Sequence, residues 1–250
     1  MKYTVITGAS SGIGYDTALA FAKRGKNLIL VARRKDKLKQ LKQEVKSINS
    51  NLEVIIKSID LSILSNVYQT YESLNNYNIE TWINNAGLGN FSPINEQSLN
   101  KIEGMLNLNI QALTIFSTLF IKDYEQVENT QLINVSSAGG YITIGNLVAY
   151  SATKFYVSAF TEGLAQELKS KNTKLKVKLL APAVTETEFE QNSLGIESFE
   201  YESNMTQFNT SKEMADFMMQ LYDGDKILGL VDENTYNFKL QEPIFPYRNG

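Results

Sequence analysis

Residues 3–14 read YTVITGASSGIG, a short β-branched run followed by glycines at positions 8, 12 and 14. Glycine allows a tight turn, a close approach of the backbone to a phosphate group, and close packing of a helix on a strand. An amphipathic stretch, Ile13–Arg24, starts where the turn ends, and the free N–H groups of a helix N-terminus attract anions. Glycines alone also occur in purely structural turns, but the strand–turn–helix context favours a phosphate-binding turn.

Short apolar runs of strand length alternate with longer amphipathic stretches along the chain. The strand-like runs are Tyr3–Thr7, Asn27–Val31, Leu52–Lys57, Ile79–Ile83, Gln131–Val135 and Leu175–Leu180. The helical stretches are Ile13–Arg24, Asp36–Ile48, Ser62–Leu74, Ile102–Tyr124 and Ala149–Lys171. This alternation predicts an α/β fold, a doubly wound and mostly parallel sheet with helices on both faces.

The composition excludes several classes of chemistry. The chain of 250 residues contains neither Cys nor His, so disulfides, thiol nucleophiles, His-based triads and zinc sites on these ligands are absent, and we expect no metal site. With 24 Lys and Arg against 27 Asp and Glu, the net charge of −3 indicates neither nucleic acid nor a membrane as a partner. We find no signal peptide and no uninterrupted apolar run of about 18 residues, and expect a cytoplasmic protein.

The length suits one domain, 1–250, and no linker or internal repeat interrupts it. Residues 185–210 are irregular and follow the last predicted parallel strand, so they lie at the carboxyl edge of the sheet, where open α/β folds bind ligands. A long insertion there is typical of a lid, and we expect it to cover a substrate. A helix at Lys212–Tyr222 and a weak strand at Ile227–Val231 follow, and we expect the tail to lie against the surface.

Two further motifs carry a family resemblance: Asn84-Asn85-Ala86-Gly87 after the fourth strand, and Tyr150-Ser151-Ala152-Thr153-Lys154 at a helix start. Together with TGASSGIG at 7–14, they resemble the short-chain dehydrogenase/reductase family over residues 3–187. The resemblance implies a Rossmann fold and hydride transfer between a nicotinamide cofactor and a small carbonyl or secondary-alcohol substrate. It also implies a homodimer or homotetramer, in which the helices Ile102–Tyr124 and Ala149–Lys171 pair across a two-fold axis.

The end of the second strand bears on the choice of cofactor. An acidic residue here accepts hydrogen bonds from the adenosine ribose and favours NAD, but this chain has Ala32 followed by Arg33 and Arg34. Arg33, which matches the family's phosphate-binding arginine, is able to clamp a 2′-phosphate, and Arg34 is a second candidate. The pattern favours NADP(H) over NAD(H), although a solvated basic turn is the alternative. Ser11 stands where many NADP-type relatives carry a basic residue.

The resemblance assigns further cofactor contacts along the chain. They are Gly8, Ser10, Ser11, Gly12, Ile13, Gly14, Asp60, Leu61, Asn85, Ala86, Gly87, Tyr150, Lys154, Pro182, Val184 and Thr187. Asp60 matches the family's adenine-contacting aspartate and is equally suited to cap the following helix. Ala183 replaces a family glycine, which costs about 1 kcal/mol if that position requires a positive φ.

Tyr150 and Lys154 lie four residues apart on a predicted helix and therefore share one face. A phenol has a pKa of about 10, and a neighbouring ammonium lowers it toward the range of a general acid/base. By resemblance, Ser137 hydrogen-bonds the substrate oxygen, whereas Ser136 is a structural alternative at the strand end. Asn109 matches the family's fourth catalytic residue, which relatives associate with a water leading from the lysine to solvent.

Other functions remain as alternatives. A non-catalytic NADP(H)-binding sensor or scaffold would have the same fold, but such relatives usually lack the tyrosine and lysine. A nucleotide-sugar epimerase or dehydratase usually has a longer chain and another glycine spacing. A 3-oxoacyl-thioester reductase needs a basic patch for an acidic carrier. The candidate residues are better explained as a solvated helix end and strand face, and they are Lys169, Lys171, Lys174, Lys176 and Lys178. Aromatic and aliphatic residues suggest a partly apolar substrate pocket, or lid packing instead: Tyr141, Ile144, Phe189, Phe199, Tyr201 and Phe208.

Overall fold

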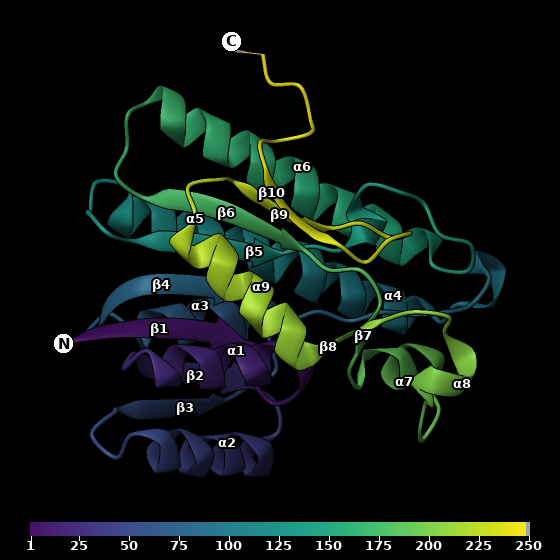
Figure 1. Cartoon of the computed structure of the whole chain (residues 1–250), viewed down its shortest axis with the longest axis horizontal. Helices are drawn as coiled ribbons and strands as arrows, with labels where there is room; N and C mark the ends of the chain where they lie inside the picture. The colour runs from purple at the N-terminus through teal and green to yellow at the C-terminus, as the bar shows by residue number, and fades with distance from the viewer. Residues whose placement is uncertain (249–250) are drawn as a thin grey trace.

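The computed structural model describes residues 1–248 and is built on one eight-stranded sheet (Figure 1). The strand order is β10-β9-β6-β5-β4-β1-β2-β3, and every neighbouring pair is parallel except β9 and β10. The strands are β1 Lys2–Thr7, β2 Asn27–Ala32, β3 Val54–Ser58, β4 Asn78–Asn84, β5 Gln131–Val135, β6 Lys176–Ala181, β9 Leu228–Val231 and β10 Phe238–Gln241. The predicted parallel sheet is confirmed.

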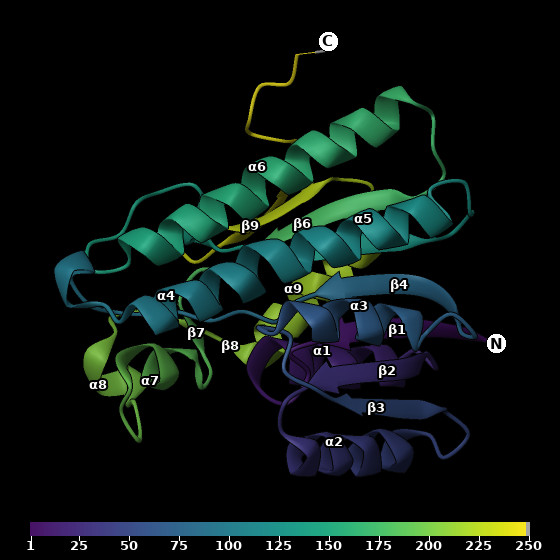
Figure 2. The same cartoon turned by 180° about the vertical axis from the view of Figure 1, so that it is seen from behind.

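Helices cover both faces of this sheet (Figure 2). On one face lie α1 (Gly12–Lys23), α2 (Lys35–Ile48) and α9 (Ser211–Asp223). On the other lie α3 (Leu64–Glu72), α5 (Leu113–Tyr124) and α6 (Val148–Ser170). The central strands are buried on both sides, which is why their sequences are almost continuously apolar rather than alternating. The doubly wound α/β fold is therefore confirmed.

The order of the strands creates a switch point at the centre of the sheet. From β1 the chain moves outward through β2 to β3, and it then returns to β4 on the other side of β1. The connections after β1 and β4 leave in opposite directions, which opens a crevice at their carboxyl ends. The glycine turn at 8–14 and the motif at 84–87 both lie at this crevice.

The helix predicted at Ile102–Tyr124 starts earlier and contains an irregular turn. It comprises α4 (Leu99–Leu106), the π-helical segment η2 (Asn107–Ala112) and α5. Among the described residues it is the one helix with the length and composition of a bilayer span, at a mean hydropathy of 1.4. Its inner face, including Phe116 and Phe120, packs in the core, and a core helix of this composition is only weak evidence for a membrane span.

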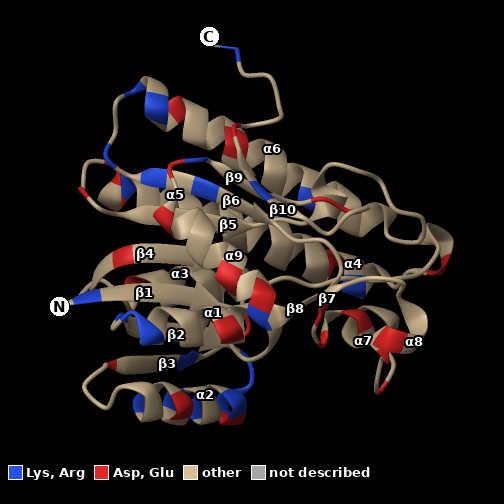
Figure 3. Cartoon of the chain, in the orientation of Figure 1, with Lys and Arg blue, Asp and Glu red and all other residues tan. Residues whose placement is uncertain are grey.

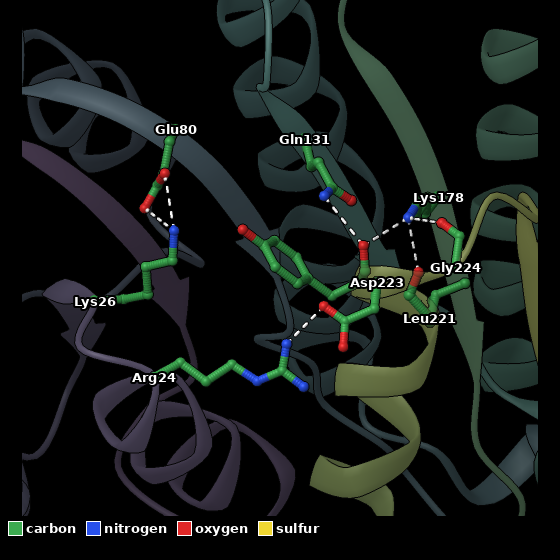
Figure 4. Close-up of polar contacts among 9 residues, drawn as sticks. Arg24, Lys26, Glu80, Gln131, Lys178, Leu221, Asp223 and Gly224 are labelled. Carbon is green, nitrogen blue, oxygen red and sulfur yellow. Dashed lines mark hydrogen bonds and ion pairs between the residues drawn. The ribbon is translucent and has the colours of Figure 1, made fainter.

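Lys178 was expected on a solvated basic face, and that expectation is wrong. Its side chain is buried between β6 and the end of α9, where Nζ donates to the carbonyl oxygens of Leu221, Tyr222 and Gly224 at 2.7, 2.9 and 2.6 Å (Figure 4). These are the carbonyls that the end of α9 leaves without helical partners, and a cation suits the negative end of a helix dipole. Burial lowers the pKa of the Lys178 ammonium to about 8.

The segment 185–210 is more regular than predicted. It contains β7 (Thr185–Glu186), α7 (Phe189–Leu194), α8 (Tyr201–Asn204) and β8 (Asn209–Thr210), and β7 pairs with β8 in a second, two-stranded sheet. The ring of Tyr201 packs against Phe199 and Phe208, with centroids 4.9 and 5.3 Å apart. We call residues 185–210 the lid, because they stand over the carboxyl edge of the main sheet (Figure 1).

The C-terminal tail is attached to the domain through a buried carboxylate. Glu162 of α6 accepts hydrogen bonds from the backbone N–H groups of Ile244 and Phe245 at 2.7 and 2.8 Å. Its other oxygen accepts the hydroxyl of Tyr141, whose ring stacks on Phe245 at 5.5 Å. The tail therefore lies against the surface as predicted, but β10, which precedes it, was not predicted from the sequence.

Candidate active site

The three glycines of the turn occupy positions that a side chain would obstruct. Gly8 and Gly12 have φ values of +69° and +54°, in the left-handed region that favours glycine. A Cβ on Gly14 would lie 2.5 Å from the carbonyl oxygen of Gly8 and closer still to Nδ2 of Asn85. A Cβ on Gly12 would lie 2.7 Å from Cγ2 of Thr187. The turn thus presents bare backbone at the start of α1, which suits an anion.

Hydrogen bonds tie this turn to the motif after β4. The hydroxyl oxygen of Thr7 accepts the backbone N–H groups of Asn85 and Ala86, both at 3.0 Å. The amide of Asn85 donates to the carbonyl oxygens of Thr7 and Gly8 at 3.0 and 3.3 Å. These hydrogen bonds fix the carboxyl ends of β1 and β4 relative to each other at the base of the crevice.

A cleft of about 630 Å³ runs along this edge of the sheet. It brings together predicted residues from distant parts of the chain: Gly8, Ser10, Ser11, Gly12, Ile13, Arg33, Arg34, Asp60, Leu61, Asn85, Ala86, Gly87, Ser137, Tyr150, Lys154, Pro182, Val184 and Thr187. Gly14 and Asn109 do not line it and lie behind residues that do. The predicted binding and catalytic positions thus share one continuous surface.

At one end of the cleft lie the residues predicted to bind the adenosine half of a dinucleotide. The Arg33 side chain is exposed and has no ion pair within residues 1–248. Arg34, in contrast, pairs with lid residue Glu188 at 2.6 Å. Asp60 accepts the N–H and hydroxyl of Ser62 at 2.9 and 2.7 Å. The N-cap of α3 is Ile63, so the alternative role of Asp60 as the helix cap is wrong.

The strand-to-lid connection forms the opposite wall. The carbonyl oxygen of Pro182 accepts the N–H of Ala138 at 2.6 Å, and the hydroxyl of Thr187 accepts the N–H of Phe189 at 3.1 Å. Ala183 has a negative φ. The replacement of the family glycine at this position therefore causes no backbone strain.

Tyr150 and Lys154 lie one turn apart in α6, and Nζ of Lys154 is 5.7 Å from the centroid of the Tyr150 ring. The ammonium donates to the carbonyl oxygen of Val135 at 3.0 Å, and burial lowers its pKa to about 8. Burial raises the pKa of the Tyr150 phenol, the Ser137 hydroxyl opposes that shift, and the Glu190 carboxylate adds to it. In this state of the site the phenol holds its proton firmly.

The two neighbouring serines have different environments. Ser136 is buried, donates to the carbonyl oxygen of Lys154 at 2.9 Å, and shares a hydrogen bond with Ser158 at 2.7 Å. Ser137 lines the cleft, and its hydroxyl accepts the N–H of Gly139 at 3.1 Å, which leaves its proton available. The hydroxyl that faces the cleft beside Tyr150 is therefore that of Ser137.

Asn109 lies within η2 and holds the chain that follows β4. Its amide oxygen accepts the N–H of Leu88 at 2.9 Å, and its amide nitrogen donates to the carbonyl of Leu88 at 2.9 Å and to the hydroxyl of Thr153 at 3.0 Å. The Cβ position of Gly87 lies 3.6 Å from both Oδ1 of Asn109 and Nζ of Lys154. Asn109 is therefore next to the lysine but behind the surface of the cleft.

The predicted substrate-pocket residues fall into two groups. Phe189 and Ile144 line the cleft, and the Phe189 ring lies 5.3 Å from that of Tyr150. The remaining four make packing contacts outside the cleft lining: Tyr141, Phe199, Tyr201 and Phe208. For Phe199, Tyr201 and Phe208 the structure agrees with the alternative of lid packing, whereas Tyr141 packs against the C-terminal tail, which was not predicted.

Two lid carboxylates in the cleft were not predicted. Glu188 pairs with Arg34, which holds the pKa of its carboxyl below the usual range. The carboxylate of Glu190 has no hydrogen bond or ion pair among residues 1–248, and burial raises its pKa. The sequence shows acids at 186, 188 and 190, but which of them reach the cleft depends on the start of α7 at Phe189, and that helix was not predicted.

Comparison with known proteins identifies the family. The model of the short chain dehydrogenase family matches residues 2–195. The chain belongs to the short-chain dehydrogenase family. The match ends within the lid, so the similarity covers the glycine turn, the motif after β4 and the tyrosine–lysine pair.

Several short-chain dehydrogenases resemble this one along most of their length. "Dehydrogenase/reductase SDR family member 11" of Homo sapiens is 30% identical over 194 residues, which cover 75% of each chain. "Very-long-chain 3-oxoacyl-CoA reductase" of Rattus norvegicus is 30% identical over 175 residues, 68% of this chain and 55% of that protein. The solved short-chain dehydrogenase from Sphingobium yanoikuyae in complex with NADPH superposes with a TM-score of 0.83 at 28% identity, covering 91% of this chain and 86% of that one.

Proposed function

We propose that this short-chain dehydrogenase is an NADP(H)-dependent oxidoreductase that transfers a hydride between nicotinamide and a carbonyl or secondary alcohol of a small molecule. The observation that carries the proposal is the single cleft in which Tyr150, Lys154 and Ser137 share a surface with the glycine turn. The bare turn and the free Arg33 guanidinium fit a phosphorylated dinucleotide. When bound, the cofactor supplies or accepts the hydride.

In the reduction direction, Tyr150 gives its phenolic proton to the substrate oxygen as negative charge develops there. Ser137 donates a hydrogen bond to the same oxygen and orients it toward the phenol. The ammonium of Lys154 stabilises the phenolate that remains, because an opposite charge nearby favours the ionised form. In the oxidation direction the same groups act in reverse, with the phenolate as the base.

Asn109 contributes through position. Its three hydrogen bonds fix the backbone at Leu88 and the hydroxyl of Thr153, and so define the wall behind Lys154. A water that restores the proton of Lys154 from solvent would lie beside this wall. Such a water adds to the bonds of Asn109 rather than replacing them.

The preference for NADP(H) over NAD(H) rests on the end of β2. Ala32 has no carboxylate to accept a ribose hydroxyl, and Arg33 lines the cleft without an ion-pair partner in the described chain. The neighbour solved with NADPH supports this preference. We expect NADPH to bind far more tightly than NADH, and Ala32→Asp combined with Arg33→Ser to invert the order in a calorimetric titration. Equal affinities in the wild type would exclude the proposed preference.

Tyr150→Phe tests the catalytic role. It should abolish NADPH consumption in a screen of ketones, aldehydes and 3-oxo thioesters while leaving NADPH binding largely intact. A variant with near-normal turnover would remove Tyr150 from the mechanism. NADPH binding without turnover of any carbonyl by the wild type would support the alternative of a cofactor-binding sensor.

A 3-oxoacyl-thioester reductase is the second candidate, favoured by the similarity to the rat 3-oxoacyl-CoA reductase. The lysines proposed as a carrier patch do not support it. Lys178 is buried, whereas Lys174 and Lys176 pair with Glu128 and Asp225 at 3.2 Å near the amino end of β6, opposite the edge that carries the cleft. A coenzyme A thioester that is reduced faster than simple ketones would favour this candidate.

We also propose a cytoplasmic homodimer or homotetramer. Apolar side chains on α4 and α6 are exposed in the single chain, among them Leu99, Leu106, Val148 and Tyr156. Burying such a surface against a second copy is favourable, because each Å² of apolar area removed from water contributes about 25 cal/mol. Light scattering of the purified protein would give the oligomeric state, and a monomer at micromolar concentration would contradict the proposal.

A further inference from the structure

Arg34 lies between the glycine turn and the lid, and its guanidinium donates hydrogen bonds to side chains of both. Its Nη2 lies 2.8 Å from the hydroxyl oxygen of Ser11 and 3.2 Å from that of Ser10, both in the glycine turn. The same nitrogen donates to Oε2 of Glu188 at 2.6 Å. The Glu188 carboxylate is thus paired with a guanidinium that also donates to the serines of the turn.

This contact joins two parts of the molecule that are far apart in the sequence. Arg34 belongs to the turn between β2 and α2, and Glu188 lies 154 residues later, at the start of the lid. Figure 3 shows basic residues at the beginning of α2 and acidic residues over α7 and α8. The ion pair therefore fastens the lid to the end of the cleft that is proposed to bind adenosine.

We infer that Glu188 occupies the place of a nucleotide phosphate, and that a 2′-phosphate displaces it from Arg34 and releases the lid. The inference rests on the proposed NADP(H) preference and adds to it a residue that sets both affinity and lid position. A carboxylate and a phosphate at the same guanidinium nitrogen repel each other, because like charges at that separation disfavour both ionised forms. Glu188 is consequently an internal competitor of the phosphate.

The inference predicts a specific asymmetry between nucleotides. A 2′-phosphate that binds at Arg34 has to displace Glu188, so removal of that carboxylate should strengthen its binding. A ligand with a free 2′-hydroxyl does not compete for Arg34 and should be indifferent to the change. If Glu188 instead remained in place and accepted a ribose hydroxyl, its removal would weaken both ligands.

Calorimetric titration with adenosine 2′,5′-bisphosphate and with 5′-AMP distinguishes these outcomes without any turnover. Glu188→Gln should tighten the bisphosphate about two- to fivefold, the range of a partly exposed ion pair, and leave 5′-AMP unchanged. Glu186→Gln, an exposed lid residue outside the cleft lining, is the matched control and should change neither affinity. Bisphosphate affinity that is unchanged or weaker in Glu188→Gln would overturn the inference.

Limited proteolysis supplies a second readout. The bisphosphate should accelerate cleavage within residues 185–210 of the wild type, and Glu188→Gln should be cleaved at the faster rate without ligand. If the lid is equally protected from cleavage in both proteins, the inference that the Arg34–Glu188 ion pair fastens the lid is overturned. If the wild type binds the bisphosphate no better than 5′-AMP, the proposed NADP(H) preference fails as well. If the wild type prefers the bisphosphate and Glu188→Gln does not increase that preference, only the role of Glu188 as a competitor is excluded.

Discussion

Replacing Gly14 with alanine tests whether this position requires glycine because a Cβ would clash with its neighbours, rather than because of its backbone conformation. Gly14 lies in α1 with an ordinary helical φ, so alanine is permitted by the backbone and should add about 1 kcal/mol of helix propensity. Its Cβ, however, would lie 2.5 Å from the carbonyl oxygen of Gly8, and closer to the amide of Asn85. Neither neighbour is able to retreat freely, because one is backbone and the other donates to Thr7 at 3.0 Å.

The magnitude follows from these contacts. Overpacking costs about 1–3 kcal/mol, and loss of the Asn85 hydrogen bond costs about 0.5–1.5 kcal/mol more. After the gain in propensity, Gly14→Ala should lower the free energy of unfolding by about 0.5–3.5 kcal/mol. Displacement of the turn should also weaken binding of NADPH, since the backbone N–H groups at the start of α1 would no longer converge.

Urea unfolding and calorimetric NADPH titration measure the two effects. Gly104→Ala in α4 and Gly163→Ala in α6 are matched controls, because nothing lies within 4 Å of either Cβ position. Both should be neutral or more stable by about 0.5–1 kcal/mol, with NADPH affinity unchanged. A Gly14→Ala protein as stable as these controls, with wild-type affinity, would refute the steric account of the turn.

Three further predictions concern other parts of the cleft and its support. Lys178→Met leaves carbonyl groups at the end of α9 unpaired and should destabilise the protein by about 2–4 kcal/mol in urea, whereas Lys176→Met, an exposed control, should change stability by less than about 0.5 kcal/mol. Gly89→Ala places a Cβ against Ser193 of the lid and should speed proteolysis of residues 185–210 with little effect on global unfolding. The pKa of the Lys154 ammonium lies near 8, and an anionic nucleotide favours its charged form, so NADPH affinity should fall as the pH rises through 8. Calorimetry from pH 7 to about 9.5 should show this decline in the wild type and not in Lys154→Met, and a parallel decline in both would contradict the assignment.

The sequence predicted the sheet well because the physical requirement for its strands is local. A parallel strand covered on both faces needs an apolar run, and Gln131–Val135 was predicted with the bounds that the structure has. The edge strand β10 lacks this signal, because Phe238–Gln241 is short and half polar and becomes a strand through pairing with β9. The helical bounds differ by a few residues for a related reason, since caps and frayed turns depend on what packs beside them.

The residues of the candidate site also divide into those that the sequence predicted and those that only the structure placed there. The tyrosine–lysine pair was predicted because a spacing of four places both side chains on one helix face. The glycine turn was predicted from its place between a strand and a helix, and Ser137 from the resemblance to the family. The π-helical turn at Asn109, the burial of Lys178 and the presence of Glu188 and Glu190 in the cleft were not recognised. Each depends on how distant parts of the chain pack together, and residue types alone do not specify that packing.

By itself the sequence determined the order of strands and helices, the place of the glycine turn, and the hydroxyl, phenol and amine groups that we propose for the chemistry of a chain without His or Cys. Only the tertiary structure decided which charges meet. It left Arg33 open to the cleft and closed Arg34 with a carboxylate from the lid, although the two arginines are adjacent in the chain. The reason is physical: backbone conformation is set by neighbours within a few residues, whereas an ion pair requires the whole fold to bring its two members into contact.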